Sequence, residues 1–156
     1  MRMGLVIYGS LNTLSGGYLY DRMLVENLAR AGHSVEIVSL PWRGYAAHLT
    51  DNFSSEVRRL LMRKRVDVWL QDEMNHPSLF RLNRDLRRLG GPPLLSIVHH
   101  LRSSENHPAV WMPLYRAVER AYLRSVDGWL FNSRTTRQTV EALTGQRRPA
   151  AVATPG

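Results

Sequence analysis

The chain has 156 residues, 44% of them hydrophobic and none of them cysteine. This length predicts one domain with a sizeable core, and the lack of cysteine excludes disulfides and thiolate metal sites. No apolar run approaches the roughly 18 residues that a membrane span needs, and the N-terminus lacks the apolar core of a signal peptide. We therefore expect a cytoplasmic protein.

The net charge is +8, and Lys64 is the only lysine among the 21 basic residues. Solvated helix faces would explain most of this charge, but a positive field also attracts anionic membrane surfaces. No nucleic-acid-binding motif accompanies the charge, so nucleic acid is not an expected partner. The basic residues form two clusters: Arg58, Arg59, Arg63, Lys64 and Arg65, then Arg81, Arg84, Arg87 and Arg88.

Short apolar segments alternate along the chain with segments whose apolar residues recur at helical spacing. The predicted strands are residues 3–8, 34–40, 66–70, 94–98, 127–131 and 150–153. The predicted helices are about 17–31, a segment starting at 54 or 55, 77–89, 110–124 and 133–143. A polar loop containing Trp42, Tyr45 and His48 follows the second strand.

This alternation predicts an α/β fold, a doubly wound, Rossmann-like parallel sheet with helices on both faces. The expected strand order is 3-2-1-4-5-6, as right-handed crossovers allow. Ligands in such folds bind outside the carboxyl ends of the strands, here near the switch between strands one and four. The residues that leave those ends are polar: Gly9, Ser10, Gln71, Asp72, Glu73, His99, His100, Asn132 and Ser133.

Gly16 and Gly17 lie between the first strand and the first helix. Such a glycine pair lets backbone N–H groups approach a phosphate at a helix start, although it could equally make only a tight turn. The dinucleotide pattern Gly-x-Gly-x-x-Gly and an acidic residue at the end of strand two are both missing. A nicotinamide or flavin cofactor is therefore disfavoured.

His99 and His100 follow a buried strand directly, where an imidazole could transfer a proton or bind a sugar hydroxyl. Strand alternation turns them to opposite sides, and His99 is the preferred candidate, with a structural role as the alternative. A zinc site that adds Glu105 and His107 fits no familiar ligand spacing, so no metal is expected. Carboxylates such as Asp72 could bind acceptor hydroxyls or cap the following helix.

The chain resembles the N-terminal domain of family 4 glycosyltransferases of the two-domain GT-B type. The resemblance covers nearly the whole chain and depends on the order of four segments. These are Gly4–Ser10 with Gly16-Gly17, the Leu-Ala-x-x-Gly-His-x-Val passage at 28–35, the strand 95–100 ending in histidine, and Asp127–Ser133. Residues 153–156, which contain Pro155-Gly156, resemble the start of the family's crossover into its second domain.

This resemblance implies a retaining hexosyltransferase that moves a sugar from a nucleotide-sugar to a hydroxyl acceptor, without a metal or other cofactor. It implies that residues 1–156 form the acceptor-side domain and that a C-terminal domain binds most of the donor. The implied site residues are Gly16 and Gly17 at the donor diphosphate, His99 or His100 at the transferred sugar, and Gln71, Asp72, Glu73 and Ser133 on the acceptor side.

The implied partners are the nucleotide-sugar, a sugar or lipid-linked acceptor, the C-terminal domain and an anionic membrane surface on the inner face. Because the family's paired glutamates lie in the second domain, residues 1–156 alone are expected to fold but not to catalyse. One alternative is a non-catalytic Rossmann-like module that binds a sugar or nucleotide. Another is an unrelated Rossmann enzyme, such as a methyltransferase or a nucleotide-dependent reductase.

Overall fold

The computed structural model describes residues 1–154 and contains one six-stranded sheet, all of it parallel. The strands are β1 (Arg2–Tyr8), β2 (Ser34–Leu40), β3 (Val68–Asp72), β4 (Leu94–Val98), β5 (Gly128–Phe131) and β6 (Ala150–Val152). The helices are α1 (Gly16–Arg30), α2 (Tyr45–Asp51), α3 (Ser55–Arg63), α4 (His76–Arg88), α5 (Met112–Leu123) and α6 (Arg134–Thr144). Two 3₁₀ turns, η1 (Glu73–Asn75) and η2 (Arg102–Ser104), follow β3 and β4. The predicted doubly wound, Rossmann-like architecture is confirmed.

The predicted strand order is wrong in one respect, because the sheet runs β2-β1-β3-β4-β5-β6. β3 pairs with β1, and β2 forms the edge. The burial of the two strands gives the reason. Every residue of β3 is buried, whereas β2 exposes polar residues such as Glu36. A strand buried on both faces belongs in the centre of a parallel sheet, and a strand with polar positions is suited to an edge.

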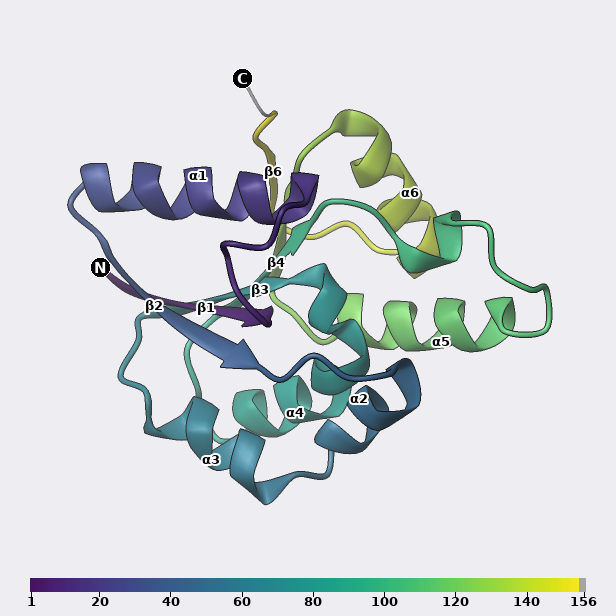
Figure 1. Cartoon of the computed structure of the whole chain (residues 1–156), viewed down its shortest axis with the longest axis horizontal. Coiled ribbons are helices and arrows are strands. Elements are labelled where there is room, and N and C mark those ends of the chain that lie inside the picture. Colours follow the sequence, from purple (N-terminus) through teal and green to yellow (C-terminus); the bar gives the residue numbers. More distant parts are fainter. Residues whose placement is uncertain (155–156) are drawn as a thin grey trace.

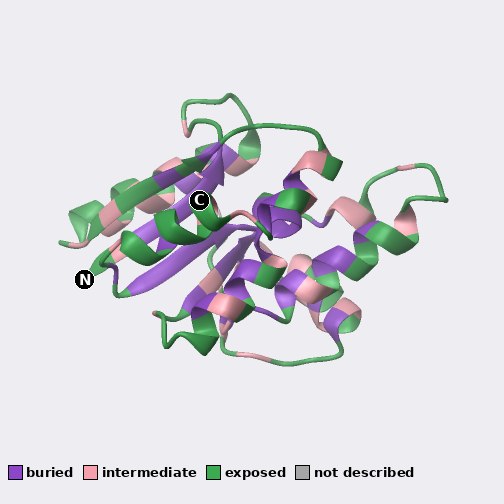
Figure 2. Cartoon of the chain, turned by 90° about the horizontal axis from the view of Figure 1, so that it is seen from below, coloured by how far each residue is buried: buried purple, intermediate pink, exposed green. Residues whose placement is uncertain are grey.

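The helices are distributed unequally over the two faces of the sheet, as Figure 1 shows: α1 lies on one face, and α2, α3, α4 and α5 lie on the other. The larger apolar core lies between the second face and its helices, which contribute residues such as Leu61, Leu79 and Tyr122. A smaller core lies under α1 and contains Tyr18 and Ile97. Figure 2 shows that the buried residues are concentrated in the strands and on the inward sides of the helices. Both cores fix the carboxyl ends of β1, β3 and β4 side by side.

Two local differences from the sequence prediction affect the site. β3 extends to Asp72 instead of ending at residue 70, so Gln71 and Asp72 belong to the strand. The loop after β2 contains a helix, α2, which begins after Gly44. The predicted strand at 150–153 is confirmed as β6, while Pro155 and Gly156, used in the family resemblance, lie outside the described residues.

Candidate functional site

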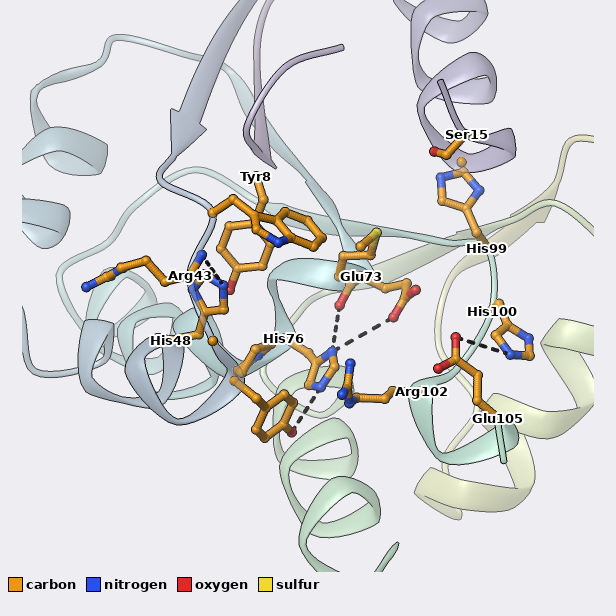
Figure 3. Close-up of a pocket in the computed structure, with 16 residues that line it drawn as sticks. Tyr8, Ser15, Arg43, His48, Glu73, His76, His99, His100, Arg102 and Glu105 are labelled. Atoms are coloured by element: carbon orange, nitrogen blue, oxygen red, sulfur yellow. Dashed lines mark hydrogen bonds and ion pairs between the residues drawn. The ribbon is translucent and has the colours of Figure 1, made fainter. Parts of the chain in front are cut away.

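The new strand order moves the switch point to the gap between β1 and β3. The chain leaves β1 toward β2 and leaves β3 toward β4, in opposite directions along the sheet. A crevice forms at such a point, outside the carboxyl ends of the strands. Here it is a cavity of about 440 Å³, lined by residues that follow β1, β2, β3 and β4. Figure 3 shows its side chains.

At one end of the cavity, His99 lies against the start of α1 (Figure 3). A Cβ atom built on Gly17 would be 3.4 Å from Cδ2 of His99, so the imidazole lies within van der Waals reach of the first turn of the helix. Ser15 caps the helix by accepting a hydrogen bond from the N–H of Tyr18. Gly16 starts the helix in open space. The structure thus brings together the glycine pair and the histidine, while the roles assigned to them stay predictions.

The two adjacent histidines differ in environment. His99 is 11% exposed and its Nε2 lies 3.0 Å from Oδ1 of Asp21, which is fully buried. His100 is 55% exposed, and its Nε2 is 3.9 Å from Glu105. Both line the cavity, but only His99 is held by a buried partner.

Burial and the acidic groups around His99 have opposite effects on its pKa. Burial by itself lowers the pKa of His99, but the hydrogen bond and charge of Asp21 and the charge of Asp72 outweigh it and raise the pKa. Burial, together with the charge of Asp21, raises the pKa of Asp72 to about 7. Buried carboxyl groups near one another are expected to behave in this way. This end of the cavity therefore combines an imidazole whose charged form is favoured with the N-terminus of a helix.

Glu73 reaches the cavity, but the other residues predicted for the acceptor side do not line it. Gln71 is fully buried and exchanges two hydrogen bonds with Asn83 of α4, at 2.8 and 3.0 Å. Asp72 accepts a hydrogen bond from the N–H of Met74, so it caps η1. Ser133 caps α6 by accepting from the N–H of Thr136. These positions indicate structural roles for Gln71 and Ser133.

The floor of the cavity is a buried polar cluster beneath Glu73 (Figure 3). His76 donates from Nδ1 to the carbonyl of Glu73, at 2.9 Å, and its Nε2 accepts from the hydroxyl of Tyr45, at 3.1 Å. Burial lowers the pKa of His76 to about 3, so this histidine is neutral. Burial, followed by the charges of Asp72 and Glu119, raises the pKa of Glu73 well above its ordinary value. The floor therefore presents a neutral imidazole and a carboxyl group whose neutral form is favoured.

The wall opposite His99 was missed by the sequence analysis, which treated the segment after β2 only as a polar loop. Trp42 is 60% exposed, and its ring lies edge-on to Tyr8, which stacks on His48. The guanidinium of Arg102 lies over the rings of Tyr45 and Tyr115, 5.0 and 4.7 Å from their centroids. The available signal was aromatic residues placed directly after an edge strand, at the ligand-binding edge of the sheet.

Two clusters have the spacing of metal ligands: Asp21, Asp72 and His99, and Glu73, His76 and Glu119. Hydrogen bonds already engage one imidazole nitrogen of His99 and both of His76. Nε2 of His99 faces the Asp21 carboxylate and so carries a proton, and both nitrogens of His76 have partners. A protonated nitrogen offers no lone pair to a metal. Hydrogen bonding thus accounts for the orientation of both imidazoles.

The zinc set considered from the sequence is arranged around Glu105. His107 lies 3.0 Å from one oxygen of this carboxylate, and His100 lies 3.9 Å from the other. His99 faces Asp21 instead. The four residues are therefore not gathered around one point.

Comparison with protein-family models and with curated proteins finds no match to this chain. Among residues 1–154, the helices are all too short or too polar to cross a lipid bilayer.

Proposed function

We propose that this chain is the acceptor-side half of a retaining glycosyltransferase that moves a hexose from a nucleotide-sugar to a hydroxyl group. The observation that carries the proposal is that His99 and Gly17 lie close together and line one cavity at the ligand-binding edge of the sheet. The family resemblance drawn from the sequence joins these same two elements. No metal or other cofactor is assigned to the reaction.

The end of the cavity near His99 suits the donor. The first N–H groups of an α-helix have no partner within the helix, and the helix dipole favours negative charge there. Ser15 accepts from the N–H of Tyr18, whereas Gly16 and Gly17 have no side chains to cover their N–H groups. The raised pKa of His99 favours the cationic imidazole beside them. A diphosphate therefore finds backbone donors and a positive charge together. In the proposed enzyme, a second domain closes over this end and holds the rest of the nucleotide-sugar.

The opposite end suits a sugar-containing acceptor. Trp42 exposes an indole on which the apolar face of a sugar ring can pack, and Tyr45 and Glu73 offer hydrogen-bonding groups. Ligand sites commonly combine an apolar lining with a few polar groups in this way. Arg102 adds a positive charge that lies against two tyrosine rings, which suits an acidic or phosphate-linked acceptor.

The proposal is tested first by binding. Titration of residues 1–156 with UDP-glucose, UDP-N-acetylglucosamine and GDP-mannose, followed by NMR, should shift the amide signals of Gly16, Gly17 and His99. The variant His99→Gln keeps an N–H donor for Asp21 but loses the cation, so the affinity should fall about tenfold, or about 1.4 kcal/mol. His33→Gln is the control, because His33 lies at the opposite end of the strands, beside Met1.

Transfer is then assayed with the complete product of the gene and the nucleotide-sugar that binds. Transfer with retention of the anomeric configuration would support the proposal. Binding without transfer would favour the non-catalytic module. Binding of S-adenosylmethionine or a dinucleotide in place of a nucleotide-sugar would favour an unrelated Rossmann enzyme and overturn the proposal.

We also propose that α3 contacts the inner face of a membrane. Arg58, Arg59 and Arg63 are exposed on this helix, and the side chains of Leu60 and Met62 are exposed between them. Basic residues near an anionic lipid surface each contribute about 1 kcal/mol to binding. The protein should therefore co-sediment with vesicles containing phosphatidylglycerol, and the variant R58Q/R59Q/R63Q should do so far less. Equal sedimentation with neutral phosphatidylcholine vesicles would contradict the proposal.

A further inference from the structure

Asp21 is an acidic residue buried inside the first helix, on the side that faces the sheet. Its side chain is fully buried, and Oδ1 lies 3.0 Å from Nε2 of His99. Its second oxygen, Oδ2, is buried and has no hydrogen-bond partner among residues 1–154. A buried carboxylate oxygen without a donor costs free energy, so we expect a hydrogen-bond donor close to this atom.

Asp72 supplies the only other buried acidic side chain of this cluster. It ends β3, is 1% exposed, and accepts a hydrogen bond from the N–H of Met74 through Oδ1. One atom each of Asp21, Asp72 and His99 lie within 4.8 Å of one another. Two ionised carboxylates this close in a buried site repel each other strongly, and one shared proton removes that repulsion.

We propose that Asp21 and Asp72 share one proton and that Asp21 is a positioning residue for His99, holding its imidazole as a cation. In this arrangement, Asp72 donates the shared proton to the otherwise unpartnered oxygen of Asp21. The other oxygen of Asp21 accepts the Nε2–H of His99. The cluster then carries one negative and one positive charge, so the buried cation is balanced.

The neighbouring groups are consistent with this assignment. From α1, Tyr18 and Tyr20 face the cluster, and the ring of Tyr20 lies 4.9 Å from that of His99. Burial, then the charges of Asp72 and Asp21, raise the pKa of Tyr18 to about 12, so it stays neutral. From η1, Glu73 also faces the cluster, and burial followed by the charge of Asp72 raises its pKa, which favours the neutral form. His99 is therefore the cation that balances the two carboxyl groups.

The arrangement leaves the second imidazole nitrogen free for a ligand. Nδ1 of His99 has no hydrogen-bond partner among residues 1–154. This atom is not buried, and His99 lines the cavity. A cationic His99 presents Nδ1–H as a donor, which selects an anionic oxygen in preference to a hydroxyl hydrogen. This ligand assignment rests on the proposed function, whereas the proton assignment does not.

The test follows protons in the free protein, without any ligand. Histidine Cε1–H signals are titrated from about pH 4 to pH 9 in the wild type, Asp21→Asn, Asp72→Asn and the double variant. Asparagine mimics a protonated aspartic acid, so Asp72→Asn should shift the His99 midpoint by less than about half a pH unit. Asp21→Asn should lower the midpoint by at least about one unit, and the double variant should lower it below 6.5, the ordinary histidine value.

A second measurement uses the wild type alone, in case a variant fails to fold. Aspartate Cγ signals at about pH 5.5 should show one protonated carboxyl group, although an ordinary aspartate is ionised there. Complete ionisation of all aspartates at that pH would overturn the proposal. So would a fall in the His99 titration midpoint that is as large in Asp72→Asn as in Asp21→Asn. Since no ligand is used, failure of nucleotide-sugar binding and failure of this proposal are separate outcomes.

Discussion

Replacing Gly4 with alanine should destabilise the domain by about 3 kcal/mol, at the upper end of overpacking effects. A Cβ on Gly4 would lie 2.3 Å from Cζ3 of Trp69, which is 1% exposed. The ring belongs to β3 and the glycine to β1, and β1 is hydrogen-bonded on both sides. Neither strand can move away from the other. Urea denaturation followed by circular dichroism measures the loss.

The control for this prediction is Gly44→Ala. Gly44 has no atom within 4 Å of a built Cβ and has a φ of −67°, which alanine adopts readily. Its substitution should change the free energy of unfolding by less than about 0.5 kcal/mol. Adding Trp69→Leu to Gly4→Ala should restore part of the lost stability, because the smaller side chain removes the clash. Simple addition of the two single losses would contradict a clash between these residues.

Replacing Asn83 with leucine should cost about 3 kcal/mol, since it leaves a buried amide without partners. Asn83 exchanges two hydrogen bonds with Gln71 and donates a third to Ser125, at 2.9 Å. Asn83 and Gln71 are fully buried. After the substitution, the Gln71 amide would lose both of its bonds to Asn83 inside the apolar core. The loss is read from the midpoint of thermal or urea unfolding.

The double variant Gln71→Leu/Asn83→Leu separates this cause from poor packing. Removing both amides eliminates the unsatisfied groups, so the double variant should be more stable than Asn83→Leu. If the two substitutions destabilise additively, the pair does not act as a hydrogen-bonded unit. In either result, the cavity should keep its ligand preference, because neither residue lines it.

The strand order shows what could and what could not be predicted from the sequence. Alternating apolar strands and amphipathic helices were enough to predict a doubly wound parallel sheet. The position of β2 was also encoded, in Ser34, Glu36 and Ser39, which are unsuited to a central strand. The expected order 3-2-1-4-5-6 did not use that signal and placed the switch point one strand away.

Polar residues at strand ends were harder to interpret. Gln71 and Glu73 look alike in the sequence, yet one pairs with Asn83 in the core and the other reaches the cavity. The difference depends on where β3 stops and η1 begins, by one or two residues. Boundaries of this kind are set by packing against α4 and β4, which single-residue propensities do not contain.

The sequence alone therefore determined the layers of the fold, most of the strands, and the presence of a glycine pair before the first helix and of a histidine at a strand end. These features follow from local periodicity and from backbone geometry, which act over a few residues. Only the tertiary structure brought Asp21 to His99, 78 positions apart, and placed Trp42 on the same cavity as His99. Such contacts depend on which strands pair and on how much water burial removes, and both are properties of the assembled sheet.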